Sequence, residues 1–323
     1  MLQPCQTQPA PGNTGRSGQT FYSIRVADPP TGLPEVTLEN PTHVQGFQAV
    51  RASRFPVPLF ELDTYLARIG WTGRRVPTLD TLNVLTRAHM SAIPFENLDV
   101  LLGRGVKVDL DSIFAKLVLA RRGGYCFEHA TLFHAVLEQF GFRARTHAAR
   151  VVMIVPRTEA PRTHMLISLE IDGRPIVVDP GFGGHGPLVP VPLVAGMDVS
   201  DGTDRHRFVR EHDEWVLQAE IGGRMVSLWT STLEPLQPVD VVMANHYVST
   251  FPESPFVNRL MLRAITNVAR TSVMNRDVTV RRAAEATTYQ LADRAALRSL
   301  LARDFGFDLD VESLRVPSVP EWK

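Results

Sequence analysis

Three residues have the types and surroundings that nucleophilic catalysis needs: Cys126, His164 and Asp179. Cys126 follows Gly123-Gly124 at the predicted first turn of a helix, where the positive end of the helix dipole favours thiolate, the reactive form of cysteine. A cysteine nucleophile needs a base to take its proton and a third group to orient that base. The alternative interpretation of Cys126 is a small buried apolar residue without chemistry.

His164 and Asp179 are brought together by a predicted β-hairpin. Two strand-like runs flank Asp172-Gly173, a dipeptide typical of a tight turn between antiparallel strands. If the strands pair in register, both side chains lie near the same end of the hairpin, within hydrogen-bonding reach. Asp179 also follows three branched apolar residues, where a carboxylate without a partner is costly. The plainer alternatives are a turn aspartate before Pro180 and an ordinary core histidine, and spacing alone leaves both open.

The elements that must position Cys126 are helical. Four runs with apolar residues three to four apart predict a helical bundle, with Thr78 and Asp111 as caps of the second and third helices and Gly141 ending the fourth. The predicted helices cover residues 60–69, 78–88, 111–118 and 126–140. The segment 93–99 between them is predicted to be non-helical, with Glu96 and Asn97 in an apolar loop.

The elements that must position His164 and Asp179 are strands. After Gly141 the apolar period changes to two, which predicts an antiparallel region of the kind that forms small barrels. The predicted strands are 143–155, 164–171, 175–179, 207–209, 214–221, 225–229 and, later, 278–280. Further along, 235–238 is predicted as a linker, 247–262 as an interdomain helix, and Asp293 as the cap of a last helix that stops at Gly306.

These elements suggest four segments along the chain. We expect a disordered or loosely packed, proline-rich extension at 1–53, a helical bundle carrying the nucleophile at 54–140, a β-barrel carrying histidine and aspartate at 141–246, and an interdomain helix with a lid at 247–323.

Composition narrows the class of protein. The chain of 323 residues is 44% hydrophobic and 21% charged, ordinary for a globular protein. Its 34 Lys and Arg balance 34 Asp and Glu, which argues against bulk attraction to nucleic acid or a membrane surface. No signal peptide and no run long enough to span a bilayer are readable. Two cysteines, Cys5 and Cys126, make no disulfide framework, so we expect a reducing, cytoplasmic setting.

Two other site types fit the residues poorly. Gly181 to Gly186 match the dinucleotide pattern G-x-G-x-x-G, but three prolines at 187, 190 and 192 prevent the helix that this pattern requires. The loop could still let a ligand approach the backbone closely. Cys126, His129 and His134 are spaced for metal ligation on paper, but no second cysteine joins them, and we expect no metal site.

Several sequence blocks together resemble the arylamine N-acetyltransferase family from about Phe60 onward. The blocks are Tyr65-Leu66-Ala67-Arg68-Ile69-Gly70, Ile93-Pro94-Phe95-Glu96-Asn97-Leu98-Asp99, Arg122-Gly123-Gly124-Tyr125-Cys126-Phe127-Glu128, His164 with Asp179-Pro180-Gly181-Phe182-Gly183, and Ser249-Thr250-Phe251-Pro252-Glu253-Ser254-Pro255-Phe256. The resemblance implies an α+β fold with a papain- or transglutaminase-like cysteine core: a helical bundle, an antiparallel β-barrel and an α/β lid.

The resemblance also implies roles for individual residues. Cys126 would accept an acetyl group from acetyl-CoA, with His164 as base and Asp179 as its orienting group, and pass it to an arylamine or arylhydrazine in a ping-pong reaction. Phe256 would be an aromatic wall beside the acceptor. The loop Gly181, Phe182, Gly183 and Gly184 would lie where the pantetheine of coenzyme A enters. Arg122 and Glu96 would form a structural ion pair, and neither a metal nor a bound prosthetic group is implied.

Some positions depart from the family pattern and other functions stay open. His129-Ala130 stand where relatives often have a polar residue and asparagine, and Pro180 follows Asp179, which leaves the acceptor preference open. The alternatives are a papain-like cysteine amide hydrolase, an amide synthase that uses another acyl donor, and a binding module without catalysis. The presence of all three candidate catalytic residues argues against the last.

Overall fold

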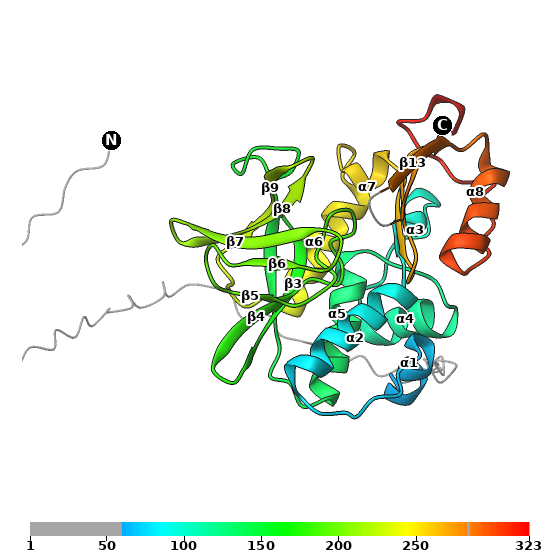
Figure 1. Cartoon of the computed structure of the whole chain (residues 1–323). Helices are drawn as coiled ribbons and strands as arrows, with labels where there is room; N and C mark the ends of the chain where they lie inside the picture. The colour runs from blue at the N-terminus through cyan, green and yellow to red at the C-terminus, as the bar shows by residue number, and fades with distance from the viewer. Residues whose placement is uncertain (1–59, 283–284, 323) are drawn as a thin grey trace, which may run out of the picture. The chain divides into compact units, whose positions relative to one another are not determined.

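The computed structural model describes residues 60–282 and 285–322, and the predicted extension at 1–53 lies outside them. The described residues form a helical part, an eight-stranded antiparallel sheet and a five-stranded antiparallel sheet (Figure 1). The predicted α+β class, with a helical bundle, a barrel and a lid, is confirmed.

The helical part contains the four predicted helices, but the prediction of 93–99 as non-helical was wrong at its end, because a short helix begins at Leu98. It contains α1 (Leu62–Ile69), α2 (Leu79–Ala92), α3 (Leu98–Leu101), α4 (Leu110–Phe114), the π-helix η1 (Ala115–Leu119) and α5 (Cys126–Gln139). Thr78 caps α2 as predicted, because its side chain accepts a hydrogen bond from Thr81 N. The prediction of Asp111 as a cap was wrong: Asp109 accepts from Ser112 N at 2.9 Å and caps α4, which places Asp111 inside the first turn.

Helix α5 is the central element of the helical part. Most of its side chains are buried in the hydrophobic core, among them Phe127, Phe133 and Leu137. It packs against α4 on one side and against strand β3 (Arg162–Ile171) on another. Because Cys126 is the first residue of α5 and His164 lies near the start of β3, this packing brings the two residues into one region.

The eight-stranded sheet curls into a nearly closed barrel. Its strands, in spatial order, are β5 (Val191–Pro192), β4 (Arg174–Val178), β3, β2 (Arg145–Val151), β9 (Arg224–Ser231), β8 (Glu214–Ile221), β7 (Arg205–Glu211) and β6 (Asp198–Ser200). The segment after β5 returns to the other end of the sheet, where Gly196 N donates to Phe208 O of β7 at 2.7 Å. This bridge brings the two ends of the curled sheet together.

The hairpin between β3 and β4 has the predicted turn. Asp172 and Gly173 have positive φ values of 51° and 74°, as a two-residue type I′ turn requires. The strands pair with Ile171 opposite Arg174 and Ile167 opposite Val178, which is the register needed to bring His164 and Asp179 to one end.

The second sheet joins distant parts of the chain. Its order is β1 (Phe95–Glu96), β10 (Met261–Ile265), β11 (Arg270–Met274), β12 (Asp277–Arg282) and β13 (Glu285–Gln290). Helix α8 (Arg294–Leu300) is capped by Asp293, and the π-helix η2 (Leu301–Phe305) that continues it ends at Gly306, both as predicted. The 3-10 helix η3 (Pro320–Trp322) completes the lid. Phe95 of the helical part pairs with Arg263 of the lid, so the lid is attached beside the predicted site.

The predicted linker at 235–238 and helix at 247–262 were wrong in their bounds. The structure has α6 (Pro238–Thr250), α7 (Pro255–Asn258) and then β10. Pro238 starts α6, because proline fits the first helical position, and Pro252 and Pro255 cannot lie inside one continuous helix. The segment boundary predicted between 246 and 247 falls inside α6.

Candidate active site

Cys126 is held at the start of α5 by close backbone packing. Its side chain is 3% exposed, and Sγ lies 3.7 Å from Thr163 O, to which it can donate. A Cβ on Gly123 would lie 2.2 Å from Pro94 O, and one on Gly124 would lie 2.6 Å from Glu128 Oε2. Only glycine therefore fits the two positions before Tyr125, which explains the double glycine just before Cys126.

His164 and Asp179 form the predicted hydrogen bond, with His164 Nε2 2.9 Å from Asp179 Oδ2. Both side chains are buried. Burial by itself lowers the pKa of His164, but the charge and hydrogen bond of Asp179, together with Cys126, outweigh it and raise the pKa to about 10. The direction of this shift favours the protonated ring. Because Nε2 faces Asp179, Nδ1 is the nitrogen left for Cys126.

A third side chain, Trp229 on β9, binds the same carboxylate oxygen. Its Nε1 donates to Asp179 Oδ2 at 2.8 Å, and the indole is fully buried. Sequence reasoning missed this residue, because nothing in the alternating pattern of the 225–229 run marks it as a hydrogen-bond donor to a residue fifty positions away. Asp179 is thus fixed by two donors rather than one.

The loop after Asp179 packs directly on Cys126. A Cβ on Gly181 would lie 2.6 Å from the Cα of Cys126, so the loop backbone contacts the start of α5. The Phe182 ring meets the His164 ring edge to face, with centroids 5.2 Å apart. Gly183 lies over Phe95, where a Cβ would be 3.1 Å from that ring. Of the predicted loop residues, Gly181 lies against Cys126, Phe182 against His164 and Gly183 against Phe95.

Phe256 takes part in an aromatic cluster beside the nucleophile. Its ring lies 5.4 Å from that of Tyr125 and 6.4 Å from that of Phe95, centroid to centroid. Asn97 fixes its backbone, because Asn97 Nδ2 donates to Phe256 O at 2.9 Å. Asn97 Oδ1 accepts a hydrogen bond from Met261 N at 2.9 Å, which connects the aromatic cluster to the lid sheet. The amide that stood out in the apolar loop at 93–99 is therefore a positioning group.

The predicted ion pair of Arg122 with Glu96 is present and belongs to a larger network. Arg122 Nη2 lies 2.6 Å from Glu96 Oε1 and 3.1 Å from Asp99 Oδ1. Lys116 Nζ lies 2.8 Å from both Asp99 and Glu128. Burial raises the pKa of Glu128 to about 7 although Lys116 opposes the shift. Sequence reasoning missed Lys116 and Asp99, which help to hold the segment before Cys126.

His129 lies in a buried hydrogen-bond chain rather than on the helix surface. Its Nε2 lies 3.2 Å from Pro94 O, and its Nδ1 lies 2.9 Å from His89 Nε2. His89 Nδ1 lies 2.9 Å from Tyr65 OH. Burial lowers the pKa of His129 to about 4 and that of His89 well below its ordinary range, so both rings are neutral at pH 7. The chain supports Pro94, which also accepts a hydrogen bond from Gly124 N.

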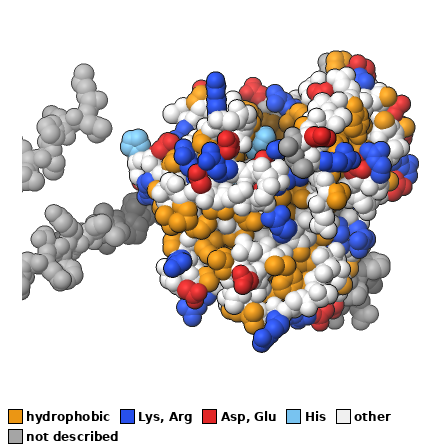
Figure 2. Space-filling view, viewed as in Figure 1, with side chains coloured by type: hydrophobic (Ala, Val, Ile, Leu, Met, Phe, Trp, Pro, Cys, Tyr) orange, Lys and Arg blue, Asp and Glu red, His pale blue; other side chains and the backbone are white. Residues whose placement is uncertain are grey.

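The described residues contain no group of three or more His, Cys, Asp or Glu side chains placed to hold a metal ion. His134, one of the candidate ligands, points instead toward Ala144 O, 3.2 Å from its Nε2. In the same part of the chain, no helix is both long and apolar enough to cross a membrane. On the face shown in Figure 2, positive and negative side chains are interspersed, in line with the net charge of zero.

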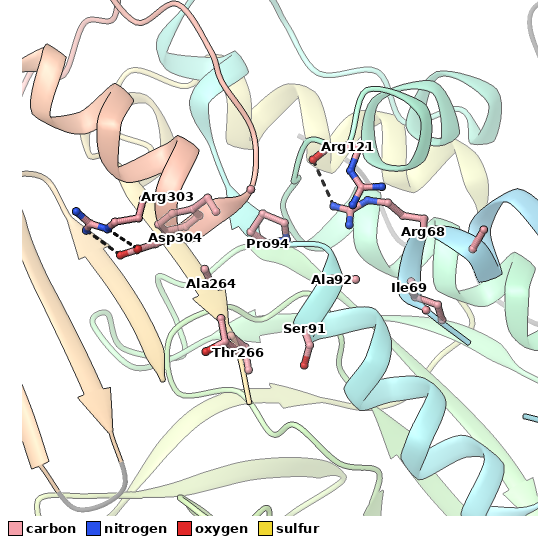
Figure 3. Close-up of a pocket in the computed structure, with 15 residues that line it drawn as sticks. Arg68, Ile69, Ser91, Ala92, Pro94, Arg121, Ala264, Thr266, Arg303 and Asp304 are labelled. Atoms are coloured by element: carbon pink, nitrogen blue, oxygen red, sulfur yellow. Dashed lines mark hydrogen bonds and ion pairs between the residues drawn. The ribbon is translucent and has the colours of Figure 1, made fainter. Parts of the chain in front are cut away.

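A cavity of about 450 Å³ lies between the helical part and the lid, and Figure 3 shows its lining. None of the predicted site residues lines it. Arg68 donates to Arg121 O at 3.3 Å on one wall, and Arg303 pairs with Asp304 on another. Burial and the charge of Arg121 lower the pKa of Arg68 to about 10. The cavity is separate from the Cys126 site.

Comparison with known proteins agrees with this geometry. A family model described as N-acetyltransferase matches residues 78–314. The arylamine N-acetyltransferase of Mycolicibacterium smegmatis is 38% identical over 256 residues, covering 77% of this chain and 92% of the relative. That of Escherichia coli K12 is 36% identical over 251 residues, covering 77% of this chain and 89% of the relative.

Solved structures give the same result. The arylamine N-acetyltransferase from M. tuberculosis superposes with a TM-score of 0.73 at 38% identity, covering 76% of this chain and 94% of that one. The Mycobacterium marinum arylamine N-acetyltransferase in complex with CoA superposes with a TM-score of 0.73 at 36% identity, covering 76% of this chain and 93% of that one.

Proposed function

The chain belongs to the arylamine N-acetyltransferase family, and we propose that it transfers the acetyl group of acetyl-CoA to an arylamine or arylhydrazine through an acetyl-Cys126 intermediate. The observation that carries the proposal is the convergence of Cys126, His164 and Asp179 at the junction of α5 and the β3–β4 hairpin. The raised pKa of His164 supports a thiolate–imidazolium pair in the resting enzyme.

In the first half-reaction, the Cys126 thiolate attacks the thioester carbonyl carbon of acetyl-CoA. The tetrahedral intermediate collapses with cleavage of the bond between the acetyl carbon and the sulfur of coenzyme A. The departing sulfur takes the proton of His164, so free coenzyme A leaves as a thiol and His164 becomes neutral. Asp179, held by Trp229, keeps the His164 ring oriented throughout.

In the second half-reaction, the amine attacks the acetyl carbon of acetyl-Cys126. Neutral His164 accepts a proton from the amine, the bond from carbon to Sγ breaks, and the thiolate–imidazolium pair is restored. Phe256 and Phe182 would offer aromatic surfaces to a flat acceptor, and the loop Gly181 to Gly184 would lie along the path of the donor. No step needs a metal or a bound prosthetic group.

The test is the intact mass of the full chain, first with acetyl-CoA and then with an arylamine. We expect the mass of one acetyl group to be added and then removed by the amine, with Cys126→Ala unlabelled and Cys5→Ala labelled as wild type. Cys126 is buried at the start of α5, and the smaller alanine fits there without a clash, so Cys126→Ala should fold normally. Turnover in a folded Cys126→Ala protein would rule out the covalent mechanism.

The same experiment separates the two remaining alternatives. A cysteine amide hydrolase would lose the acetyl group to water at the same rate with or without amine. An amide synthase with another acyl donor would remain unlabelled by acetyl-CoA while a different acyl thioester labels Cys126.

A further inference from the structure

Arg263 is a buried cation in the lid that binds backbone rather than a carboxylate. Its side chain lies on β10 and the residue is 3% exposed. Within residues 60–282 and 285–322 it forms no ion pair, whereas its neighbours Arg270 and Arg281 both pair with Asp204. Burial and the charge of Arg270 lower its pKa to about 10, so it stays protonated at neutral pH. Because a buried unpaired cation is costly, the groups that solvate it are informative.

Those groups are carbonyls of the glycine loop, which we define as residues 181–186. Arg263 Nη1 donates to Gly183 O at 2.6 Å, and both terminal nitrogens lie 3.4 Å from Gly186 O. His206 Nε2 donates to the carbonyl of His185 at 2.8 Å. Three carbonyls of this short loop are therefore held by donors from the lid and the barrel.

Arg263 and a turn within the loop, in which Gly186 N donates to Gly183 O at 2.9 Å, together fix where the loop amides point. In a trans peptide the C=O and N–H groups point in opposite directions, so binding of Gly183 O by Arg263 turns the N–H of Gly184 away from the lid. Among the hydrogen bonds of the described residues, the Gly184 N–H donates to no protein acceptor. A Cβ on Gly184 would meet no atom within 4 Å, so the loop is open at this residue.

The anchored loop is also in contact with the reacting groups. Gly181 packs on the Cα of Cys126, and Gly183 packs on the ring of Phe95. Phe95 in turn pairs with Arg263 between β1 and β10. A change in the side chain of Arg263 is therefore transmitted to the loop beside the nucleophile without touching Cys126, His164 or Asp179.

We propose that Arg263 is a positioning residue for the acyl donor: it holds the glycine loop so that the open face at Gly184 receives the part of the donor beyond its thioester. The inference rests on the proposed function, since it assigns the glycine loop to the donor. It applies to donors that carry a long polar chain, such as acetyl-CoA. A small ester such as p-nitrophenyl acetate reaches Cys126 without using that face of the loop.

Arg270 provides a matched control. Like Arg263 it is a buried arginine of the lid sheet, but its guanidinium binds Asp204 at 2.6 Å and Asp201 at 2.9 Å and does not contact the glycine loop. Arg270→Met therefore removes a buried cation and weakens the contact of lid and barrel. It leaves the carbonyls of Gly183 and Gly186 bound.

The experiment measures the rate of Cys126 acylation in the full chain with acetyl-CoA and with p-nitrophenyl acetate. We expect Arg263→Met to lower the rate with acetyl-CoA by about tenfold to a hundredfold relative to p-nitrophenyl acetate, the effect of losing charge-assisted hydrogen bonds. Arg263→Lys should recover part of the loss, because one ammonium donor remains. Arg270→Met should lower thermal stability and leave the ratio of the two rates at the wild-type value.

Equal losses with both donors, or no loss, would overturn the proposal. If Arg263→Met does not fold, Arg263→Gln carries the same comparison, and a wild-type ratio in that variant overturns it as well. Failure of the wild-type chain to be acylated by either donor would instead contradict the proposed function. The two failures are therefore distinguishable.

Discussion

Trp229 and His164 donate hydrogen bonds to the same oxygen of Asp179, at 2.8 Å and 2.9 Å. The carboxylate is buried, and its other oxygen has no hydrogen-bond partner within the described residues. The orientation of the His164 ring therefore depends on a tryptophan on a different strand as well as on its own hairpin.

Trp229→Phe should keep the ring packing and remove one donor to Asp179. Loss of a hydrogen bond to a charged group costs about 1.5–3 kcal/mol, so we expect a lower free energy of unfolding by that amount. We also expect kcat/KM to fall, but by less than in Asp179→Asn, which alters the bond to His164 itself. Urea unfolding and steady-state kinetics measure the two effects. Unchanged values for both would show that the indole bond does not support Asp179.

The raised pKa of His164 predicts a reactive Cys126 at mildly acidic pH. A proton held by His164 up to pH about 10 keeps its positive charge beside the sulfur throughout the neutral range, and the charge is lost only as pH rises through that value. Iodoacetamide should therefore alkylate Cys126 at pH 6 faster than it alkylates Cys5. In His164→Ala and Asp179→Asn we expect this rate to fall by about tenfold or more. Site-resolved mass spectrometry gives the rates, and equal rates in all three proteins would contradict the ion pair.

The buried chain of Tyr65, His89 and His129 predicts a loss of stability in acid. Folding depresses the pKa of His129 from 6.5 to about 4. The free energy of unfolding is therefore unaffected by this residue above pH 6.5 and decreases as pH falls from 6.5 toward 4, because the unfolded chain takes up the proton first. This shift corresponds to about 3 kcal/mol. We expect His129→Asn to have a flatter dependence of the free energy of unfolding on pH between 6.5 and 4 than wild type. His134→Asn, at a partly exposed histidine, is the control and should match the wild-type slope.

Gly181 predicts a steric effect on the nucleophile itself. The Cβ of Gly181→Ala would lie 2.6 Å from the Cα of Cys126, so the loop or the start of α5 must move. We expect acylation of Cys126 to slow by about tenfold or more, because small displacements of reacting groups are costly. Gly105→Ala is the control, since its Cβ would meet nothing within 4 Å although its φ is 70°. It should cost about 1–2 kcal/mol of stability and leave acylation unchanged.

Local signals in the sequence were sufficient to predict the helix that begins with Cys126 and the hairpin that brings His164 and Asp179 together. The Asp172-Gly173 turn and the period-two runs beside it determined the hairpin and its register, because a two-residue turn permits few strand alignments. The spacing of apolar residues after Cys126 determined α5. The hairpin alone brought His164 and Asp179 to one end, which made their hydrogen bond an expectation, while a turn aspartate and a core histidine stayed open as alternatives.

The bounds of other elements depended on context that short-range patterns lack. Pro238 could be interpreted as part of a linker or as the first residue of a helix, and the packing of α6 on β3 decided for the helix. Strand β1 is only two residues long and becomes a strand because β10 pairs with it across more than a hundred positions. Such pairing depends on chain folding, not on local propensity.

Only the tertiary structure revealed the residues that support the site. Trp229 and Arg263 each act through a hydrogen bond to a partner far away in sequence, and their own neighbours in the chain carry no sign of it. Asn97 stood out as an amide in an apolar loop, but only the structure showed its partners. The sequence by itself determined the reactive types and the two elements that present them. The physical reason for the difference is range: turn chemistry and side-chain periodicity operate over a few residues, whereas a buried donor finds its acceptor only after the barrel, the helices and the lid have packed together.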